Sequence, residues 1–276
     1  MKIYIELTGG IGNQLFQFAK ALELEEKYGI NSVVLAYRCS YESNILHENN
    51  RIDEWFNIGY KIKKYCLTEL IHKVSKIIKF NNSKFKTFQE NWWFENKHMG
   101  EHLNNNIHSL WVRSLFQQRP DDRVLRNIRK IITNNIKYQN NQNEYCALHI
   151  RMGDHLNNSN LINLSKYYNN IIKIYEETNL PIKIITNGDK DEVMKLLGKT
   201  NKSFEILDNL SDKDSFYKLV NSRYLSICNS TFSLWAAYMS NAHKIYAPNI
   251  WFNKEIKTSK QFESLYDNKW KIINDE

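Results

Sequence analysis

Three short polar segments carry residue types suited to binding a phosphate or a sugar. The first is rich in glycine, the second holds an arginine between a histidine and an aspartate, and the third combines an amide with hydroxyl groups. They read Gly9-Gly10-Ile11-Gly12-Asn13-Gln14, His149-Ile150-Arg151-Met152-Gly153-Asp154 and Asn229-Ser230-Thr231-Phe232-Ser233. Each follows an apolar run typical of a buried strand, so each is expected at a strand end.

The first segment gathers three of the nine glycines of the chain. Glycine permits positive φ and close approach of backbone N–H groups, and the helix that follows carries partial positive charge at its start. Leu15 stands where the third glycine of a dinucleotide fingerprint belongs, and no P-loop sequence occurs. The segment is therefore either a tight turn or a contact with a sugar or phosphate, and both interpretations stay open.

The second segment follows a predicted strand over residues 145–150. Strand alternation places His149 and Arg151 on one face of the sheet. The guanidinium is a planar, permanently charged fork that suits a diphosphate. The competing interpretation is an ion pair between Arg151 and Asp154 that only fixes the turn.

The third segment stands at a predicted helix start. Ser230 or Thr231 can cap that helix, which is worth about 1 kcal/mol. The same N–H groups can instead hold a phosphate. Taken alone, this segment favours the cap.

A fourth pattern, Asp189-Lys190-Asp191, has the D-x-D form with which many glycosyltransferases hold a divalent ion. It also suits the acidic first turn of a helix. No zinc-ligand spacing or hydrolase motif accompanies it. We therefore interpret the pattern as a helix start, and the sequence predicts no metal site and no cofactor.

The elements that must position these segments alternate between strand and helix. Strands are expected over 3–7, 32–36, 145–150, 182–186, 204–207, 224–228 and 244–247, and helices over 14–28, 120–132, 165–178, 191–197, 213–221 and 232–240. Such alternation specifies parallel sheets covered by helices, with ligands outside the carboxyl ends of the strands. Residues 40–115 are irregular by pattern, and a polar segment over 134–144 predicts domains at 1–138 and 139–276.

Composition limits the class of protein. The 276 residues are 42% hydrophobic and 13% aromatic, which excludes a disordered chain. No apolar run reaches the roughly 18 to 20 residues of a membrane span, and the first residues resemble a strand rather than a signal peptide. The four cysteines lack C-x-x-C spacing and are expected to be reduced. We expect a cytoplasmic protein.

The net charge of +8 indicates anionic partners. Nucleic acid is not expected, because no zinc-finger or RNP-like pattern accompanies the charge. Residues 61–80 show a basic amphipathic helix pattern. A solvated face of a packed helix is the simpler interpretation, and peripheral docking at the inner face of the plasma membrane is the alternative.

Taken together, the three ordered segments resemble those of the bacterial α-1,2-fucosyltransferases of glycosyltransferase family 11. The resemblance spans both ends of the chain. It rests on the glycine-rich opening, on an H-x-R-x-G-D motif and on the third segment with its tryptophan. These residues are Gly9 to Gln17, His149 to Asp154 and Asn229 to Trp235.

The resemblance implies a GT-B-like α/β fold, with two Rossmann-type domains facing across a cleft. It implies an inverting, metal-independent transfer of L-fucose from GDP-fucose to a galactose hydroxyl of a surface glycan or oligosaccharide, which can be lipid-linked. Arg151 and Asp154 would be catalytic, with Arg151 on the β-phosphate. The implied substrate-binding residues are Gly10, Gly12, Asn13, Gln14, His149, Asn187, Asn229, Ser230, Thr231 and Ser233.

Two positions depart from the family pattern. Met152 stands where a second arginine is frequent, and Asn187-Gly188 replaces an acidic pair. These departures leave open another nucleotide-sugar donor, a metal-dependent transferase using Asp189 and Asp191, and a non-catalytic nucleotide or polyanion binder. The general base is also open among Asp154, His155 and Glu6.

Overall fold

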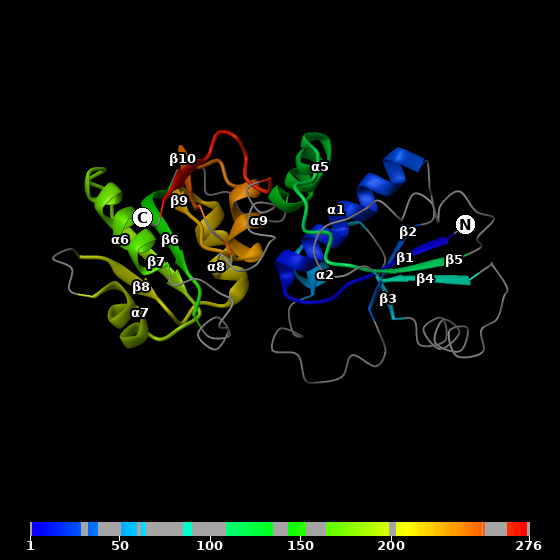
Figure 1. Ribbon diagram of the computed structural model, residues 1–276, viewed down its shortest axis with the longest axis horizontal. Coiled ribbons are helices and arrows are strands. Elements are labelled where there is room, and N and C mark those ends of the chain that lie inside the picture. Colours follow the sequence, from blue (N-terminus) through cyan, green and yellow to red (C-terminus); the bar gives the residue numbers. More distant parts are fainter. Residues whose placement is uncertain are drawn as a thin grey trace. The chain divides into compact units, whose positions relative to one another are not determined.

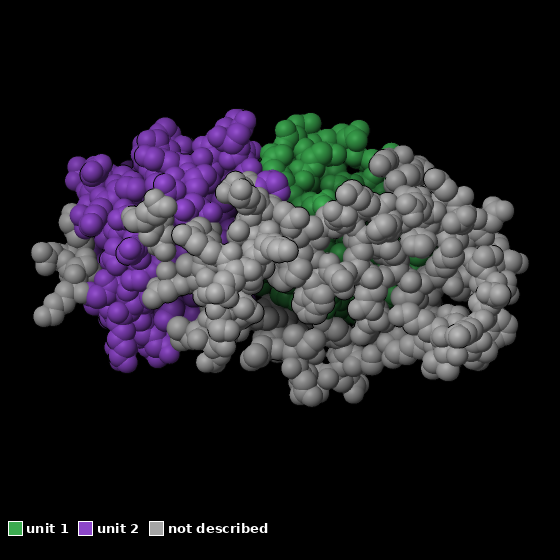
Figure 2. Space-filling view, in the orientation of Figure 1, with its two compact units in different colours: residues 1–135 green, residues 136–276 purple. Residues whose placement is uncertain are grey.

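The computed structural model describes residues 2–28, 33–37, 51–59, 62–64, 85–89, 109–134, 143–152, 164–198, 203–249, 251 and 264–274. The chain divides into two compact units, residues 1–135 and 136–276, which Figure 2 colours separately. The predicted boundary at 138/139 lies outside the described residues.

The N-terminal unit is built on a five-stranded parallel sheet with strand order β3-β2-β1-β5-β4. Its strands are β1 (Lys2–Glu6), β2 (Val33–Tyr37), β3 (Lys63–Lys64), β4 (Phe85–Gln89) and β5 (Ser109–Arg113), and its helices are α1 (Ile11–Tyr28), α2 (Ile52–Trp55) and α5 (Asp122–Thr133). The chain winds outward from β1 to β3 and then returns on the other side. The winding therefore reverses between β1 and β5, the place where such sheets bind ligands.

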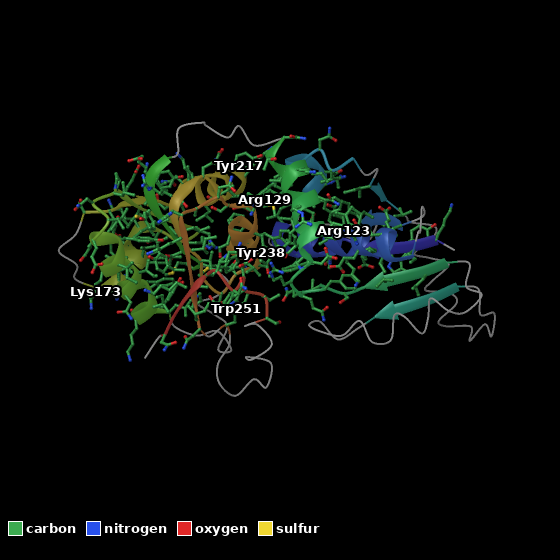
Figure 3. All side chains as sticks on the ribbon, turned by 90° about the horizontal axis from the view of Figure 1, so that it is seen from above. Arg123, Arg129, Lys173, Tyr217, Tyr238 and Trp251 are labelled. Atoms are coloured by element: carbon green, nitrogen blue, oxygen red, sulfur yellow. The ribbon has the colours of Figure 1, made fainter. Side chains whose placement is uncertain are left out.

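Side chains on both faces of this sheet are buried. Ile3 and Ile5 occupy one face, and the ring of Tyr4 stacks on Trp111 across the other, with centroids 5.5 Å apart. Arg123 of α5, labelled in Figure 3, forms an ion pair of 2.7 Å with Glu26 of α1 and links the two helices.

The C-terminal unit is built on a six-stranded parallel sheet with strand order β11-β10-β9-β6-β7-β8 (Figure 1). Its strands are β6 (Asn143–Ile150), β7 (Ile182–Thr186), β8 (Glu205–Leu207), β9 (Ser222–Ser226), β10 (Lys244–Pro248) and β11 (Lys271–Ile273). Its helices are α6 (Ser165–Glu176), α7 (Lys190–Leu197), α8 (Asp212–Val220) and α9 (Thr231–Met239). This is the doubly wound Rossmann order, with its reversal between β6 and β9.

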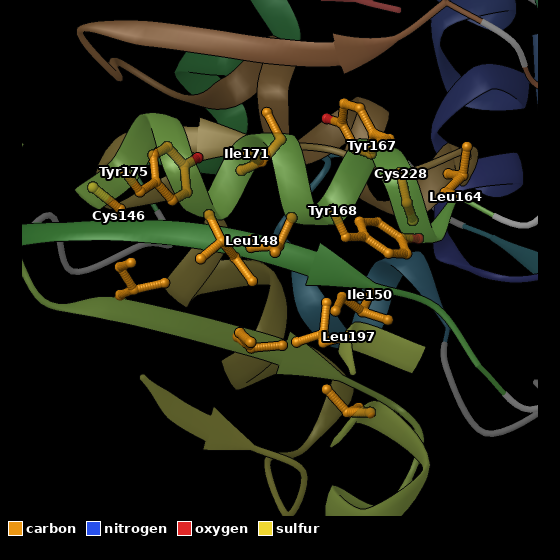
Figure 4. Close-up of a cluster of buried hydrophobic side chains, with 14 of the residues drawn as sticks. Cys146, Leu148, Ile150, Leu164, Tyr167, Tyr168, Ile171, Tyr175, Leu197 and Cys228 are labelled. Atoms are coloured by element: carbon orange, nitrogen blue, oxygen red, sulfur yellow. The ribbon is translucent and has the colours of Figure 1, made fainter. Parts of the chain in front are cut away.

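An apolar cluster holds α6 and α7 against one face of this sheet (Figure 4). Leu148 and Ile150 of β6 both belong to this cluster, because residues two positions apart in a strand face the same side of the sheet. Two buried tyrosines of α6 also bond to backbone of the sheet: Tyr167 donates to the carbonyl of Ile227, the residue after β9, at 2.7 Å, and Tyr175 donates to that of Ala147 in β6 at 2.9 Å. The cluster therefore fixes β6 and the end of β9 relative to one helix.

The sequence predictions for the C-terminal strands from β6 to β10 and for their helices are confirmed within a few residues. The structure adds α2, β3, β4, β5 and β11, which the sequence pattern did not predict. The basic helix predicted over 61–80 is wrong at its start, because Lys63 and Lys64 pair with β2 as strand β3. Residues 65–80 lie outside the described residues. Within the described part of the chain, no helix has both the length and the apolar character to cross a membrane.

Candidate functional site

The first group of predicted site residues meets where β6 and β9 end side by side. Arg151 directly follows β6, and one of its terminal nitrogens, Nη1, donates a hydrogen bond of 3.0 Å to the hydroxyl of Ser230. The two residues are 79 positions apart in sequence. The structure therefore joins the second and third polar segments at the reversal point of the C-terminal sheet.

Ser230 is buried and serves two donors at once. It is the N-cap of α9, where its oxygen accepts from the backbone N–H of Phe232 at 3.3 Å, while it also accepts from Arg151. The first turn of α9 contains no acidic residue, and Thr231, its first residue, is half-buried. The guanidinium of Arg151 thus lies beside the positive N-terminal end of α9. A bound anion would stabilise these two positive charges together.

His149 lies on the same face of β6 as Arg151, as strand alternation predicts. Its Nδ1 lies 3.1 Å from the sulfur of Cys228, and its ring packs 5.5 Å from that of Phe232. Burial raises the pKa of the Cys228 thiol to about 11, so the thiol is protonated at neutral pH. A protonated thiol can donate to a bare Nδ1 or accept from an Nδ1–H, so the His149 tautomer sets the direction of this contact.

The remaining hydroxyl and amide of the third segment bond to nearby backbone. The hydroxyl of Ser233 is fully buried, accepts from the N–H of Cys228 at 3.3 Å and donates to the carbonyl of Ser230 at 3.2 Å. The amide of Asn229 donates to the carbonyl of Trp251 at 3.0 Å. These bonds fix the shape of the loop that holds Ser230, and direct contact of Asn229 or Ser233 with a substrate stays a prediction.

The two departures from the family pattern lie against each other. Asn187 follows β7 and accepts the backbone N–H of Met152 through its Oδ1 at 2.8 Å. The side chain of Met152 is 4% exposed and belongs to the apolar cluster, on the opposite face of the strand from Arg151. A Cβ at Gly188 would stand 2.5 Å from the Met152 Cγ, so glycine is the residue that this packing admits.

Asp189 acts as a helix cap. Its carboxylate accepts the N–H of Glu192 at 2.8 Å, and Asp191 lies in the acidic first turn of α7. No group of three or more potential metal ligands occurs among the residues that the structure describes. The cap formed by Asp189 and the place of Asp191 in the first turn give the D-x-D pattern a structural role in α7.

In the N-terminal unit, the glycine-rich segment forms the turn between β1 and α1. Gly9 has a positive φ of 73°, and a Cβ there would meet the amide of Asn13 at 2.5 Å. The carbonyl of Gly10 accepts from the N–H groups of Asn13 and Gln14, and Gly12 is buried in the first turn. The turn and the close contact both need glycine at position 9.

Gln14 is buried and largely committed to the fold. Its Nε2 donates to the carbonyl of Gly9 at 2.9 Å, and its Oε1 accepts from Tyr37 at 2.8 Å and from the N–H of Ile52 at 3.0 Å. Because these bonds tie α1 to β2 and α2, substrate contact by Gln14 stays a prediction.

Gln117, beyond the end of β5, contacts the predicted site residue Asn13, and the sequence did not reveal this contact. Its side chain is 4% exposed, and its Nε2 donates to Asn13 Oδ1 at 2.8 Å. Its Oε1 has no hydrogen-bond partner in the part of the chain that the structure describes. Such a buried acceptor costs about 1–3 kcal/mol, so it calls for an explanation. The only sequence signal is its place after the apolar run Leu110-Trp111-Val112.

Several earlier candidates lie elsewhere. Asp154 and His155 lie outside the described residues. Glu6 is buried and accepts the indole N–H of Trp111 at 2.7 Å. Trp111 and Trp235 are core side chains at 1% and 0% exposure. Cys146 and Cys228 are free thiols, as expected.

The two doubly wound units have the Rossmann-type architecture of the GT-B fold. The E. coli heptosyltransferase WaaC with ADP-2-deoxy-2-fluoro heptose has the same fold, with a TM-score of 0.50 at 10% identity over 99% of this chain and 93% of that one.

The chain belongs to glycosyl transferase family 11, whose sequence model matches residues 2–274. Two Escherichia coli proteins are similar along nearly their whole length. An α-1,2-colitosyltransferase is 22% identical and covers 92% of this chain and 93% of its own. The O-antigen biosynthesis glycosyltransferase WbnK is also 22% identical and covers 95% of this chain and 99% of its own.

The bond between Asn187 and Met152 gives a testable prediction. Asn187→Ala removes the acceptor for the Met152 N–H and should lower the free energy of unfolding by about 1 kcal/mol, measured by urea denaturation. Asn187→Asp keeps an acceptor oxygen and should stay within about 0.5 kcal/mol of the unsubstituted protein. An alanine variant as stable as the aspartate variant would contradict the role of this bond.

Proposed function

We propose that the protein is an inverting, metal-independent fucosyltransferase. It transfers L-fucose from GDP-fucose to a galactose hydroxyl of a surface glycan or oligosaccharide, with an α-1,2 linkage. The observation that carries the proposal is the contact between Arg151 and Ser230 at the start of α9. Family membership, established by the match over residues 2–274, supports glycosyl transfer as the reaction class.

The proposed mechanism follows from where charge develops. The bond between the fucose anomeric carbon and the β-phosphate oxygen breaks, and its electron pair leaves with GDP. An acceptor hydroxyl oxygen bonds to that carbon from the opposite face, which inverts it, and the hydroxyl proton passes to a base. Negative charge therefore grows on the β-phosphate, where Arg151 and the positive end of α9 stabilise it.

Within this proposal Ser230 is a positioning residue. Its oxygen holds one nitrogen of the Arg151 fork and caps α9 at the same time. A guanidinium fixed in this way keeps its orientation between substrate binding and the transition state. Hydrogen-bond donors that are already oriented toward the developing charge usually make the largest single contribution to the rate enhancement of such enzymes.

The donor sugar is the open element of the proposal, because one relative is named as a colitosyltransferase. Asn187, at the position of the family's acidic pair, has its Oδ1 bonded to Met152 N, while its exposed side chain retains two amide hydrogens for a ligand. Because of that relative, a nucleotide-activated colitose is the second donor to test. The acceptor can be lipid-linked, which would suit a cytoplasmic enzyme at the inner face of the membrane.

Transfer assays test the donor and the absence of a metal together. The purified protein should convert GDP-fucose and a galactose-terminated disaccharide into an α-linked product at equal rates with EDTA and with added Mg²⁺. The product linkage is read by NMR. Activity that disappears in EDTA would overturn metal independence, and consumption of nucleotide-activated colitose but not GDP-fucose would overturn the donor assignment.

Arg151→Ala should lower kcat by about 10²- to 10³-fold, because a preorganised donor to the developing charge is lost. The matched control is Arg223→Ala, since Arg223 lies on the same sheet in an exposed ion pair with Glu144. That control should keep its rate. Near-full turnover by Arg151→Ala with an intact circular dichroism spectrum would refute the assignment.

A further inference from the structure

We propose that the side chains of Asn13 and Gln117 form an amide pair that binds one hydroxyl group of the acceptor sugar. The inference rests on the proposed glycosyl transfer and adds a residue, Gln117, that recognises the acceptor. The two side chains come from different loops, 104 positions apart in sequence, and meet through a hydrogen bond of 2.8 Å.

The amide pair lies where a parallel sheet binds ligands. Asn13 is in the first turn of α1, which follows β1, and Gln117 follows β5. These strands are neighbours, and the winding of the N-terminal sheet reverses between them. Both loops therefore stand at the carboxyl edge of the sheet, at its reversal point.

The hydrogen-bonding groups of the amide pair select a hydroxyl. Gln117 Oε1 is an acceptor with no partner among the described residues, and Asn13 Nδ2 is a donor. A sugar hydroxyl can donate to the first and accept from the second. A phosphate dianion offers only acceptors and leaves Gln117 Oε1 unsatisfied. The glycine-rich turn in this unit therefore suits a neutral sugar.

The backbone next to the amide pair is conformationally strained. Phe116 has a positive φ of 50°, which is strained for an aromatic residue, and it immediately precedes Gln117. Gly9 leaves the space that the Asn13 amide occupies. Strain next to a buried, unpaired acceptor is typical of a ligand site, because neither feature stabilises the free protein.

The acceptor is the substrate that fits this edge. Arg151, which suits the diphosphate of the donor, belongs to the C-terminal unit, whereas Asn13 and Gln117 bring two uncharged amides together in the N-terminal unit. A neutral glycan needs hydroxyl recognition and no charge neutralisation. The amide pair provides that recognition.

The test compares Gln117→Met with Gln118→Met, the same change at the exposed neighbouring residue. NMR titration without donor should show a galactose-terminated disaccharide binding about 3- to 10-fold more weakly to Gln117→Met than to the control. The KM for the acceptor should rise by the same factor, and the KM for GDP-fucose should not change. The Tm of both variants is measured as the control for folding, because Gln117→Met removes the unpaired acceptor and also the donor to Asn13 Oδ1.

Monodeoxy versions of the disaccharide identify the hydroxyl. Gln118→Met should bind one monodeoxy disaccharide about 3- to 10-fold more weakly than the unmodified disaccharide. Gln117→Met should bind these two sugars with equal affinity. Equal affinity of the two variants for the parent disaccharide, or a rise in the donor KM instead, would overturn the inference. The titration needs no turnover, so an enzyme that fails to use GDP-fucose would sink the proposed function and leave this test intact.

Discussion

The pairing of β6 with β9 places a guanidinium beside the positive end of a helix, and the proposed chemistry depends on that juxtaposition. Arg151 leaves β6, Ser230 caps α9, and a 3.0 Å hydrogen bond joins them. Two positive features held together repel each other unless an anion lies between or beside them. The first turn of α9 contains no acidic residue, and under the proposed function the β-phosphate of the donor lies beside this helix start.

The apolar cluster beneath the sheet makes this geometry possible. Met152, the residue after Arg151, is buried against Gly188, and its N–H is held by Asn187. One side of the strand end is thus fixed by packing while the other carries the charged fork. The departures from the family pattern at these positions support each other physically, because a side chain at 188 would collide with Met152.

Local patterns predicted much of the fold. The strands and helices of the C-terminal unit were recognisable because short apolar runs alternate with amphipathic segments, and the alternation of His149 and Arg151 predicted their common face. β5 was not predicted, because it is a run of only five residues whose strand conformation depends on pairing with β1, far away in the sequence. Gln117 was missed for the same reason, since its contact with Asn13 spans 104 positions. Long-range packing also decided that Trp111 and Trp235 are core residues.

The most direct test of the account is the affinity of GDP relative to GMP, measured by calorimetry for the unsubstituted protein and for Arg151→Ala. If Arg151 holds the β-phosphate, the unsubstituted protein binds GDP more tightly than GMP, and the substitution reduces that preference by about 10-fold or more while changing GMP affinity little. An unchanged preference in Arg151→Ala would contradict the central claim.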